Sequence, residues 1–287
     1  MNVNPVHVRL SLAAVGLTLA ALVSACEPES ADFVAGSVPE LVIRATDNDY
    51  PETAETAAGL TEVTIDNQGT ELHQVALLQL TDGKSFDDFT AYAATAKETD
   101  PLPNWAVPAG GPAVAAPGQK ASTFVPLESG TYAMVCNIPD AKGVPHVQKG
   151  MIKPLTVTDS EAASTDAPAA DVEIKQLDFA FQVPAKVSAG EHVIAVSNAG
   201  KQPHEAVLVK LDEGATAADV AAAFAPGASG PPPALPLGGV VAIPAGASQS
   251  FPADLTAGRY GLLCFLGDPA SAQPHVALGM MAEFDVE

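Results

Sequence analysis

The feature that most constrains the fold of this 287-residue chain is one stretch that occurs twice. The first copy, from Gly130 to Met151, reads GTYAMVCNIPDAKGVPHVQKGM, and the second, from Gly258 to Met280, reads GRYGLLCFLGDPASAQPHVALGM. In both copies an apolar run ends at a cysteine, a polar loop follows, and a histidine and a methionine come next. A long self-similar stretch of this kind indicates that a folded unit has been duplicated.

The repeat extends upstream of this stretch at a nearly constant offset. Six positions recur 131 residues later, namely Ile43, Tyr50, Gly59, Asn67, Gly69 and His73, with Ile174, Phe181, Gly190, Asn198, Gly200 and His204 as their counterparts. The offset is 128 for the glycine and the cysteine of the repeated stretch, and 129 for its histidine and methionine. It changes only inside loops, which is typical of a duplicated structure.

Short apolar runs bounded by turn residues predict strands within each copy. In the first copy these runs are Leu41–Thr46, Leu60–Asp66, His73–Leu80, Ala121–Leu127, Thr131–Cys136 and Ile152–Thr158. Ser85–Lys97 predicts a short helix with Ser85 as its N-cap, and the Pro- and Gly-rich Asp100–Gln119 predicts a loop. Each copy has roughly seven strands and one short helix. We therefore expect an all-β chain of two tandem Greek-key β-sandwiches.

The N-terminus has the pattern of an export signal. An apolar run of about fourteen residues, Leu10–Val23, follows Arg9 and is too short for a membrane span, which needs roughly twenty. The run ends in LVSAC, which resembles the lipobox of bacterial lipoproteins. That resemblance implies a signal peptide over residues 1–25, lipidation of Cys26, and anchoring to the outer face of the cytoplasmic membrane or another cell-envelope membrane. Ordinary cleavage near Ala25 is the alternative.

Composition divides the remaining chain into four segments. Residues 26–38 are polar and rich in small side chains, so we expect a flexible tether. Residues 39–158 form the first predicted domain, and residues 171–287 form the second. Residues 159–170, DSEAASTDAPAA, have no large apolar side chain, and we interpret them as a linker.

The chain is strongly acidic, with 34 Asp and Glu residues against 13 Lys and Arg residues and a formal charge of −21. This balance argues against binding to nucleic acid, which requires a basic surface. The acidic residues either form a solvated surface or steer a basic partner protein.

Each copy contributes four candidate metal ligands of the same types. They are His73, Cys136, His146 and Met151 in the first copy, and His204, Cys264, His275 and Met280 in the second. Thiolate, imidazole and thioether are the ligands that copper selects, and two imidazoles with one thiolate and a weak thioether form a blue-copper site. The alternative is that the cysteines and methionines are buried core residues and that His73 and His204 hydrogen-bond to turns.

Three motifs resemble those of the cupredoxin family. They are N-x-G-x-x-x-H at Asn67–His73 and Asn198–His204, G-x-Y-x-x-x-C at Gly130–Cys136 and Gly258–Cys264, and VPHVQKGM at Val144–Met151. The resemblance implies one copper per domain, and it implies that Asn67 and Asn198 brace the ligand loops. The loops between cysteine and histidine, with nine and ten residues, are longer than those of small cupredoxins, although they are comparable to those of copper nitrite reductases.

The remaining residues give no sign of a catalytic centre. Neither Cys136 nor Cys264 is flanked by a histidine that would lead to a second copper, and we interpret His192, which has Thr61 at its matching place, as a surface residue. We therefore expect no enzyme. We expect a carrier of single electrons that meets a redox partner protein or a membrane electron-transfer complex. A copper capture or delivery protein and a metal-free interaction module are the alternatives.

Overall fold

The computed structural model describes residues 38–96, 100–160, 166–225, 227–228 and 230–287. The predicted signal peptide, Cys26, nearly all of the tether and part of the linker lie outside the described residues. None of the helices in the described ranges is long and apolar enough to span a membrane.

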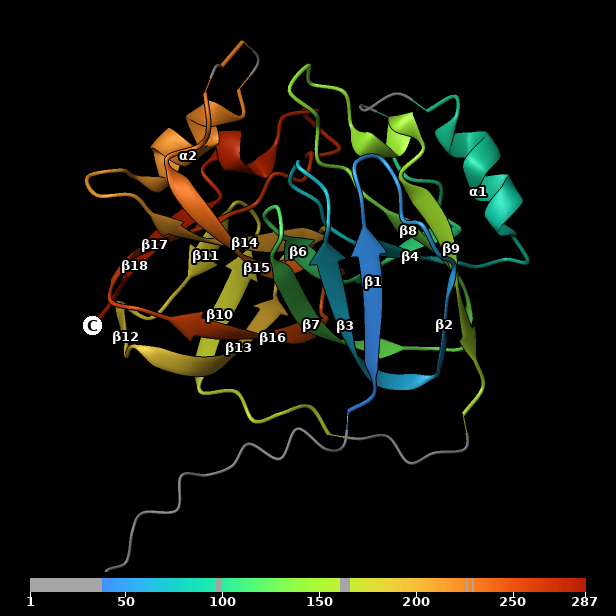
Figure 1. Ribbon diagram of the computed structural model, residues 1–287, viewed down its shortest axis with the longest axis horizontal. Coiled ribbons are helices and arrows are strands. Elements are labelled where there is room, and N and C mark those ends of the chain that lie inside the picture. The colour runs from blue at the N-terminus through green and yellow to red at the C-terminus, as the bar shows by residue number, and fades with distance from the viewer. Residues whose placement is uncertain (1–37, 97–99, 161–165, 226, 229) are drawn as a thin grey trace, which may run out of the picture. The chain divides into compact units, whose positions relative to one another are not determined.

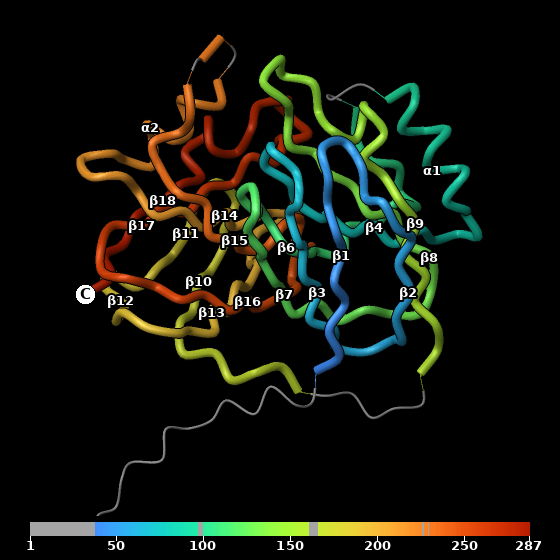
Figure 2. Tube along the Cα trace, viewed as in Figure 1, coloured from blue at the N-terminus to red at the C-terminus, as the bar shows by residue number. Residues whose placement is uncertain are grey.

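The first half of the chain folds into two facing β layers (Figure 1). One layer contains β1 (Glu40–Ala45), β3 (Gly59–Asn67) and β7 (Lys120–Leu127). The other has the order β2 (Ala54–Ala57), β9 (Ile152–Thr158), β8 (Gly130–Val135), β4 (Ala76–Leu80) and β5 (Ala106–Gly110). Figure 2 shows β3 and β7 side by side, although they are far apart in the sequence. Side chains such as Ile65, Leu77 and Leu155 fill the core between the layers.

The second half repeats this arrangement. One layer contains β11 (Ala180–Gln182), β10 (Val172–Leu177), β13 (Gly190–Asn198) and β16 (Ser248–Leu255). The other contains β12 (Lys186–Val187), β18 (Met281–Val286), β17 (Gly258–Leu263), β14 (His204–Leu211) and β15 (Ala234–Ile243). The predicted all-β sandwich fold is therefore confirmed.

The two halves share strand pairing, which the sequence did not indicate. β7 pairs with β16 at Phe124 and Ser250, and β6 (Pro112–Val114) of the first half adds to the edge of β15. The prediction of a loop over residues 100–119 is wrong, because both β5 and β6 lie there. Two glycines at positive φ, Gly110 and Gly111, turn the chain between these strands. The division into separate domains stays a prediction.

Two short helices lie outside the layers. α1 (Phe86–Ala93) begins at the predicted N-cap, because Ser85 and Asp88 form a capping box, but it ends before the predicted Lys97. α2 (Ala217–Ala223) has the same box at Thr216 and Asp219. Each half thus contains one short α-helix among the described residues, as the sequence predicts.

Candidate metal centres

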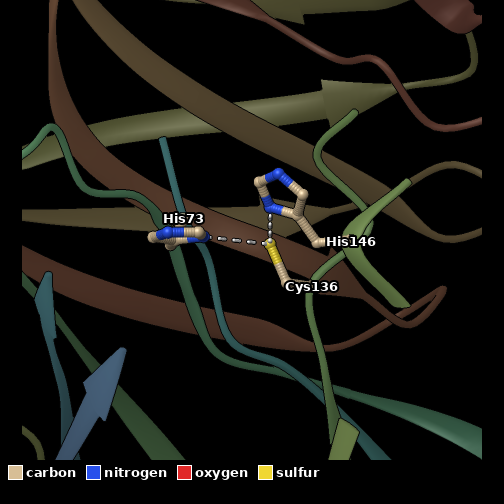
Figure 3. Close-up of side chains that lie close together, drawn as sticks. All are labelled: His73, Cys136 and His146. Atoms are coloured by element: carbon tan, nitrogen blue, oxygen red, sulfur yellow. Dashed lines mark hydrogen bonds between the residues drawn. The ribbon is translucent and has the colours of Figure 1, made fainter. Parts of the chain in front are cut away.

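The first candidate centre brings together His73, Cys136 and His146. Their ligand atoms lie within 4.8 Å of one another, and all three residues are buried. The Cys136 Sγ atom is 3.5 Å from Nδ1 of His146 and 3.9 Å from Nδ1 of His73. Figure 3 shows one nitrogen of each ring directed at the sulfur. The same ring nitrogen of both histidines therefore faces the thiol.

The second candidate centre has the same three residue types in a tighter cluster. The Cys264 Sγ atom is 3.3 Å from Nδ1 of His275, and the Nδ1 atoms of His204 and His275 are 3.0 Å apart. The backbone N–H of Glu205 donates a hydrogen bond to Cys264 Sγ (3.4 Å). All three ligand residues are buried here as well.

Backbone hydrogen bonds hold the cysteine and the following histidine together. Cys136 directly follows β8, and its N–H donates to the Met151 carbonyl (3.3 Å), while its own carbonyl accepts from Val147 (2.8 Å). His146 begins a single 3₁₀ turn, which Gly150 ends at φ 102°. The Met151 N–H then donates to the His146 carbonyl (3.0 Å). The second copy has the equivalent bonds among Cys264, Val276, His275 and Met280.

These bonds also fix the two methionines beside the clusters. Met151 and Met280 are fully buried, and the carbonyl of each accepts from the N–H of the ligand cysteine. Their role as axial ligands stays a prediction.

A carboxylate holds the outer nitrogen of the first histidine in each centre. Nε2 of His73 donates to Oδ1 of Asp47 (3.2 Å), and Nε2 of His204 donates to Oδ1 of Asp178 (3.1 Å). With the ring proton on Nε2, the lone pair of Nδ1 is directed at the cluster, which is the arrangement that metal-ligating histidines adopt. The sequence analysis missed both aspartates, although they are separated by the same offset of 131 residues as the histidines.

The glycine of each N-x-G motif makes room for this carboxylate–imidazole pair. A Cβ atom at Gly69 would overlap Asp47 Oδ1 and would lie 2.8 Å from His73 Nε2. A Cβ atom at Gly200 would meet Asp178 and His204 in the same way, with 2.7 Å to Nε2. The motif therefore needs glycine because any side chain would separate the carboxylate from the ligand ring.

Asn67 closes the turn that carries the first ligand and joins it to the segment at Ala115. Its Nδ2 donates to the carbonyls of Glu71 and Ala115, both at 2.8 Å, and its Oδ1 accepts from the Gly69 N–H (2.9 Å). Asn198 makes the matching bonds with Gln202, Ile243 and Gly200, all at 2.9 Å. Both asparagines are buried in the turns that carry the histidines.

Burial favours the neutral forms of the two thiols and of the first histidine in each centre. It raises the pKa of the Cys136 thiol to about 11 and, together with Glu205, raises the pKa of Cys264 further. Burial also lowers the pKa of His73 and His204, against the opposing effect of the aspartate on each. A metal ion that binds here must therefore displace the thiol protons, but the imidazoles of His73 and His204 are ready to bind it.

The spacing and the chemistry of the donors suit a metal ion. An ion about 2.0–2.3 Å from three ligand atoms in one plane would hold those atoms roughly 3.5–4 Å apart. The first centre fits this range, with sulfur–nitrogen distances of 3.5 and 3.9 Å. The second is tighter, with 3.3 Å between sulfur and nitrogen and 3.0 Å between its two Nδ1 atoms, so its ligands must move slightly apart to hold an ion. Two imidazoles and one thiolate are the donor set that favours copper.

The long loops are closed by interactions within the loops themselves. Asp140 accepts from the backbone N–H groups of Lys142 and Val144 and pairs with Lys149 (2.9 Å). Asp268 accepts from the N–H and hydroxyl of Ser271.

The interpretation of His192 as a surface residue is wrong. Its side chain is buried between the carboxylate of Asp171 (2.6 Å) and the Ser188 carbonyl (2.8 Å). A histidine can stay buried where both of its ring nitrogens find acceptors. The comparison of His192 with Thr61 alone could not show that such acceptors are present.

Comparison with known proteins gives structural matches only. No family model matches the sequence, and none of the curated proteins matches it. Auracyanin from Roseiflexus castenholzii is 19% identical, covers 43% of this chain and 99% of its own, and has a TM-score of 0.31. A multicopper oxidase is 15% identical over 86% of this chain and 88% of its own (TM-score 0.25). Copper nitrite reductase from Nitrosomonas europaea is 13% identical over 86% and 93% (TM-score 0.24). These matches, at 13–19% identity, are similarities of fold.

The expectation that the chain is no enzyme is contradicted by these matches. Two structures that align over 86% of it are named as an oxidase and a reductase. The expectation relied on counting spare histidines within one chain, and such a count tests only those catalytic sites that this chain would build from histidine.

Proposed function

We propose that this chain binds one copper ion in each half and transfers single electrons through the two centres. The observation that carries the proposal is the pair of buried His–Cys–His clusters, in which the Nδ1 atoms of His73, His146 and His275 face the thiol. Bound copper would supply the exchange of one electron between Cu(I) and Cu(II). Soft sulfur suits Cu(I) and imidazole suits Cu(II), so one ligand set serves both oxidation states.

The residues of the chain contribute a ligand set that is already in place. The cysteine, histidine and methionine of each repeated stretch are joined by backbone hydrogen bonds, and an aspartate holds the ring of the first histidine. A ligand set fixed in this way changes little when an electron arrives. Met151 and Met280 would complete the sets as weak axial ligands, and Asn67 and Asn198 would brace the turns.

The proposal includes a location outside the cytoplasm. It is supported by residues 1–25, which resemble a signal peptide, and by the LVSAC segment, which resembles a lipobox. Lipidation of Cys26 would tether the protein to a membrane. The chain has 34 acidic residues and only 13 basic ones. This negative charge favours a redox partner with a basic docking surface, which would be either a protein or a membrane electron-transfer complex.

The test is a Cu(II) titration of residues 27–287, followed by optical and EPR spectra. We expect an intense visible thiolate-to-copper band, narrow copper hyperfine splitting and two copper ions per chain. Cys136→Ser and Cys264→Ser should each remove one copper and leave the other. A colourless protein that takes up only Cu(I) would support capture or delivery of copper. A protein that takes up neither ion would refute the proposal.

A further inference from the structure

The two centres differ at the residue that lies two positions before the first histidine. In the first half this residue is Glu71, and at the matching place in the second half it is Gln202. Nε2 of His146 donates a hydrogen bond to Oε2 of Glu71 (2.9 Å). The imidazole is fully buried, but the carboxylate is about one-third exposed. The negative charge of Glu71 therefore reaches the cluster through a ligand ring whose Nδ1 faces Cys136.

The second centre has no such carboxylate on its second imidazole. Among the described residues, Nε2 of His275 and Oε1 of Gln202 are both buried without a hydrogen-bond partner. The amide nitrogen of Gln202 is directed elsewhere, to Asp268 Oδ1 at 3.4 Å. The His275 ring packs instead against Phe179, with ring centres 5.3 Å apart and planes 82° apart. Among the described residues, the outer nitrogen of His275 therefore has no carboxylate hydrogen-bonded to it, and Asp268 and Asp178 act on the ring only through space.

The exchange of Glu71 for Gln202 changes the basicity of the second histidine ligand. A carboxylate that accepts a hydrogen bond from the outer nitrogen raises the basicity of an imidazole ligand. A more basic ligand stabilises Cu(II) more than it stabilises Cu(I). Hydrogen bonds to an ionised acceptor are roughly twice as strong as neutral ones. We propose that Glu71 is a positioning residue that lowers the reduction potential of the first centre through His146, and that Gln202 leaves the second centre without this effect. The inference rests on the proposed function, because it requires copper at both centres.

The second centre has a carboxyl group of its own, which acts on a different ligand. Glu205 is buried, lies where the first half has Gln74, and its side chain accepts from the Phe265 N–H (2.6 Å). Its backbone N–H donates to the Cys264 sulfur. Glu205 therefore influences the thiolate side of the second centre, and a comparison of the imidazole sides requires the Glu205→Gln variant.

The experiment measures the potential of one centre at a time in redox titrations of copper-loaded protein, followed by the thiolate-to-copper band. Cys264→Ser isolates the first centre, and Cys136→Ser with Glu205→Gln isolates the second. Adding Glu71→Gln to the first protein should change the equilibrium constant for reduction about tenfold in favour of Cu(I), a rise of about 59 mV. Adding Gln202→Glu to the second should lower its potential by a similar amount.

Glu55→Gln on β2 is the matched control, because it removes the same charge from an exposed position on a strand that carries no ligand. It should leave both potentials unchanged. If Glu71→Gln and Gln202→Glu also leave the potentials of copper-loaded protein unchanged, the inference is wrong while the proposed function stands. If Glu71→Gln weakens copper binding too far to measure, Gln202→Glu decides alone. Failure of the parent protein to bind copper would refute both.

Discussion

Gly69→Ala tests whether the aspartate behind the first histidine holds the ligand in place. The new methyl group would overlap Asp47 Oδ1 and would lie 2.8 Å from His73 Nε2 and 3.0 Å from the Asp47 backbone nitrogen. The contact with backbone cannot be relieved by rotating a side chain. We therefore expect Asp47 to move away from the ring, which would break the 3.2 Å bond to His73.

The size of the effect follows from the bonds that are lost. Loss of the hydrogen-bond partner of a metal-ligating side chain typically weakens metal binding about 10–100-fold. That range corresponds to about 1.4–2.7 kcal/mol of binding free energy. Crowding in a packed site costs about 1–3 kcal/mol of folding stability in addition. Copper affinity at the first centre should therefore fall about 10–100-fold, and the metal-free protein should in addition lose about 1–3 kcal/mol of folding stability.

The assay is competition for copper against a chelator of known affinity, in the Cys264→Ser protein that has only the first centre. Gly200→Ala in the Cys136→Ser protein should give the same loss at the second centre. Gly267→Ala is the control for the second centre, because a Cβ atom there meets no other atom within 4 Å. Unchanged copper affinity in both Gly69→Ala and Gly200→Ala would refute the view that the aspartates hold the ligand rings.

Three further predictions concern stability. Asn67→Ala removes one buried and two partly buried hydrogen bonds of roughly 1 kcal/mol each, so chemical denaturation should show a loss of about 3 kcal/mol, with weaker copper binding at the first centre only. Tyr132→Phe and Tyr260→Phe each remove a hydroxyl that bonds the N–H and carbonyl of one residue four positions earlier, and each should cost about 1–3 kcal/mol without changing the optical band. Burial lowers the pKa of His192, but hydrogen bonds to Asp171 and the Ser188 carbonyl outweigh it, and the net pKa is raised. Protonated His192 should therefore stabilise the fold below the unfolded pKa of about 6.5, and this contribution should disappear as pH rises through the folded pKa. The unfolding free energy of His192→Gln, measured across this pH range, should lack the decrease that the wild-type protein shows.

The repeat in the sequence was sufficient to predict which residues meet. Two chain segments with one fold place matching residues at matching positions, so four histidines and two cysteines at near-constant offsets implied two equivalent clusters. The same reasoning applies to Asp47 and Asp178, which share the histidine offset, and it could have found them. It could not find Glu71, because duplication cannot identify a residue whose counterpart, Gln202, has different chemistry.

The strand pairing between the two halves could not be predicted from the sequence, for a different reason. Pro112 and the glycines before it predict a loop by local preference, since proline lacks an N–H and glycine weakens a strand. In the structure this segment forms an edge strand, where a missing donor is tolerated, and the Gly111 carbonyl accepts from Val241 of the other half (3.0 Å). Local preference is overruled here by a partner strand more than a hundred residues away.

The long loop between cysteine and histidine shows why its length matters little to the centre. The histidine is positioned by bonds at the two ends of the loop, where the His146 N–H donates to the Ile138 carbonyl (3.0 Å) and Val147 donates to Cys136. The His275 N–H makes the same bond to the Leu266 carbonyl (2.8 Å), although its loop has one residue more. The residues between these anchors are closed by Asp140 in one copy and Asp268 in the other. Because the anchors are the same in both copies, the loops can differ in length and sequence, and hence in the surface that they present to a partner, without moving the ligands.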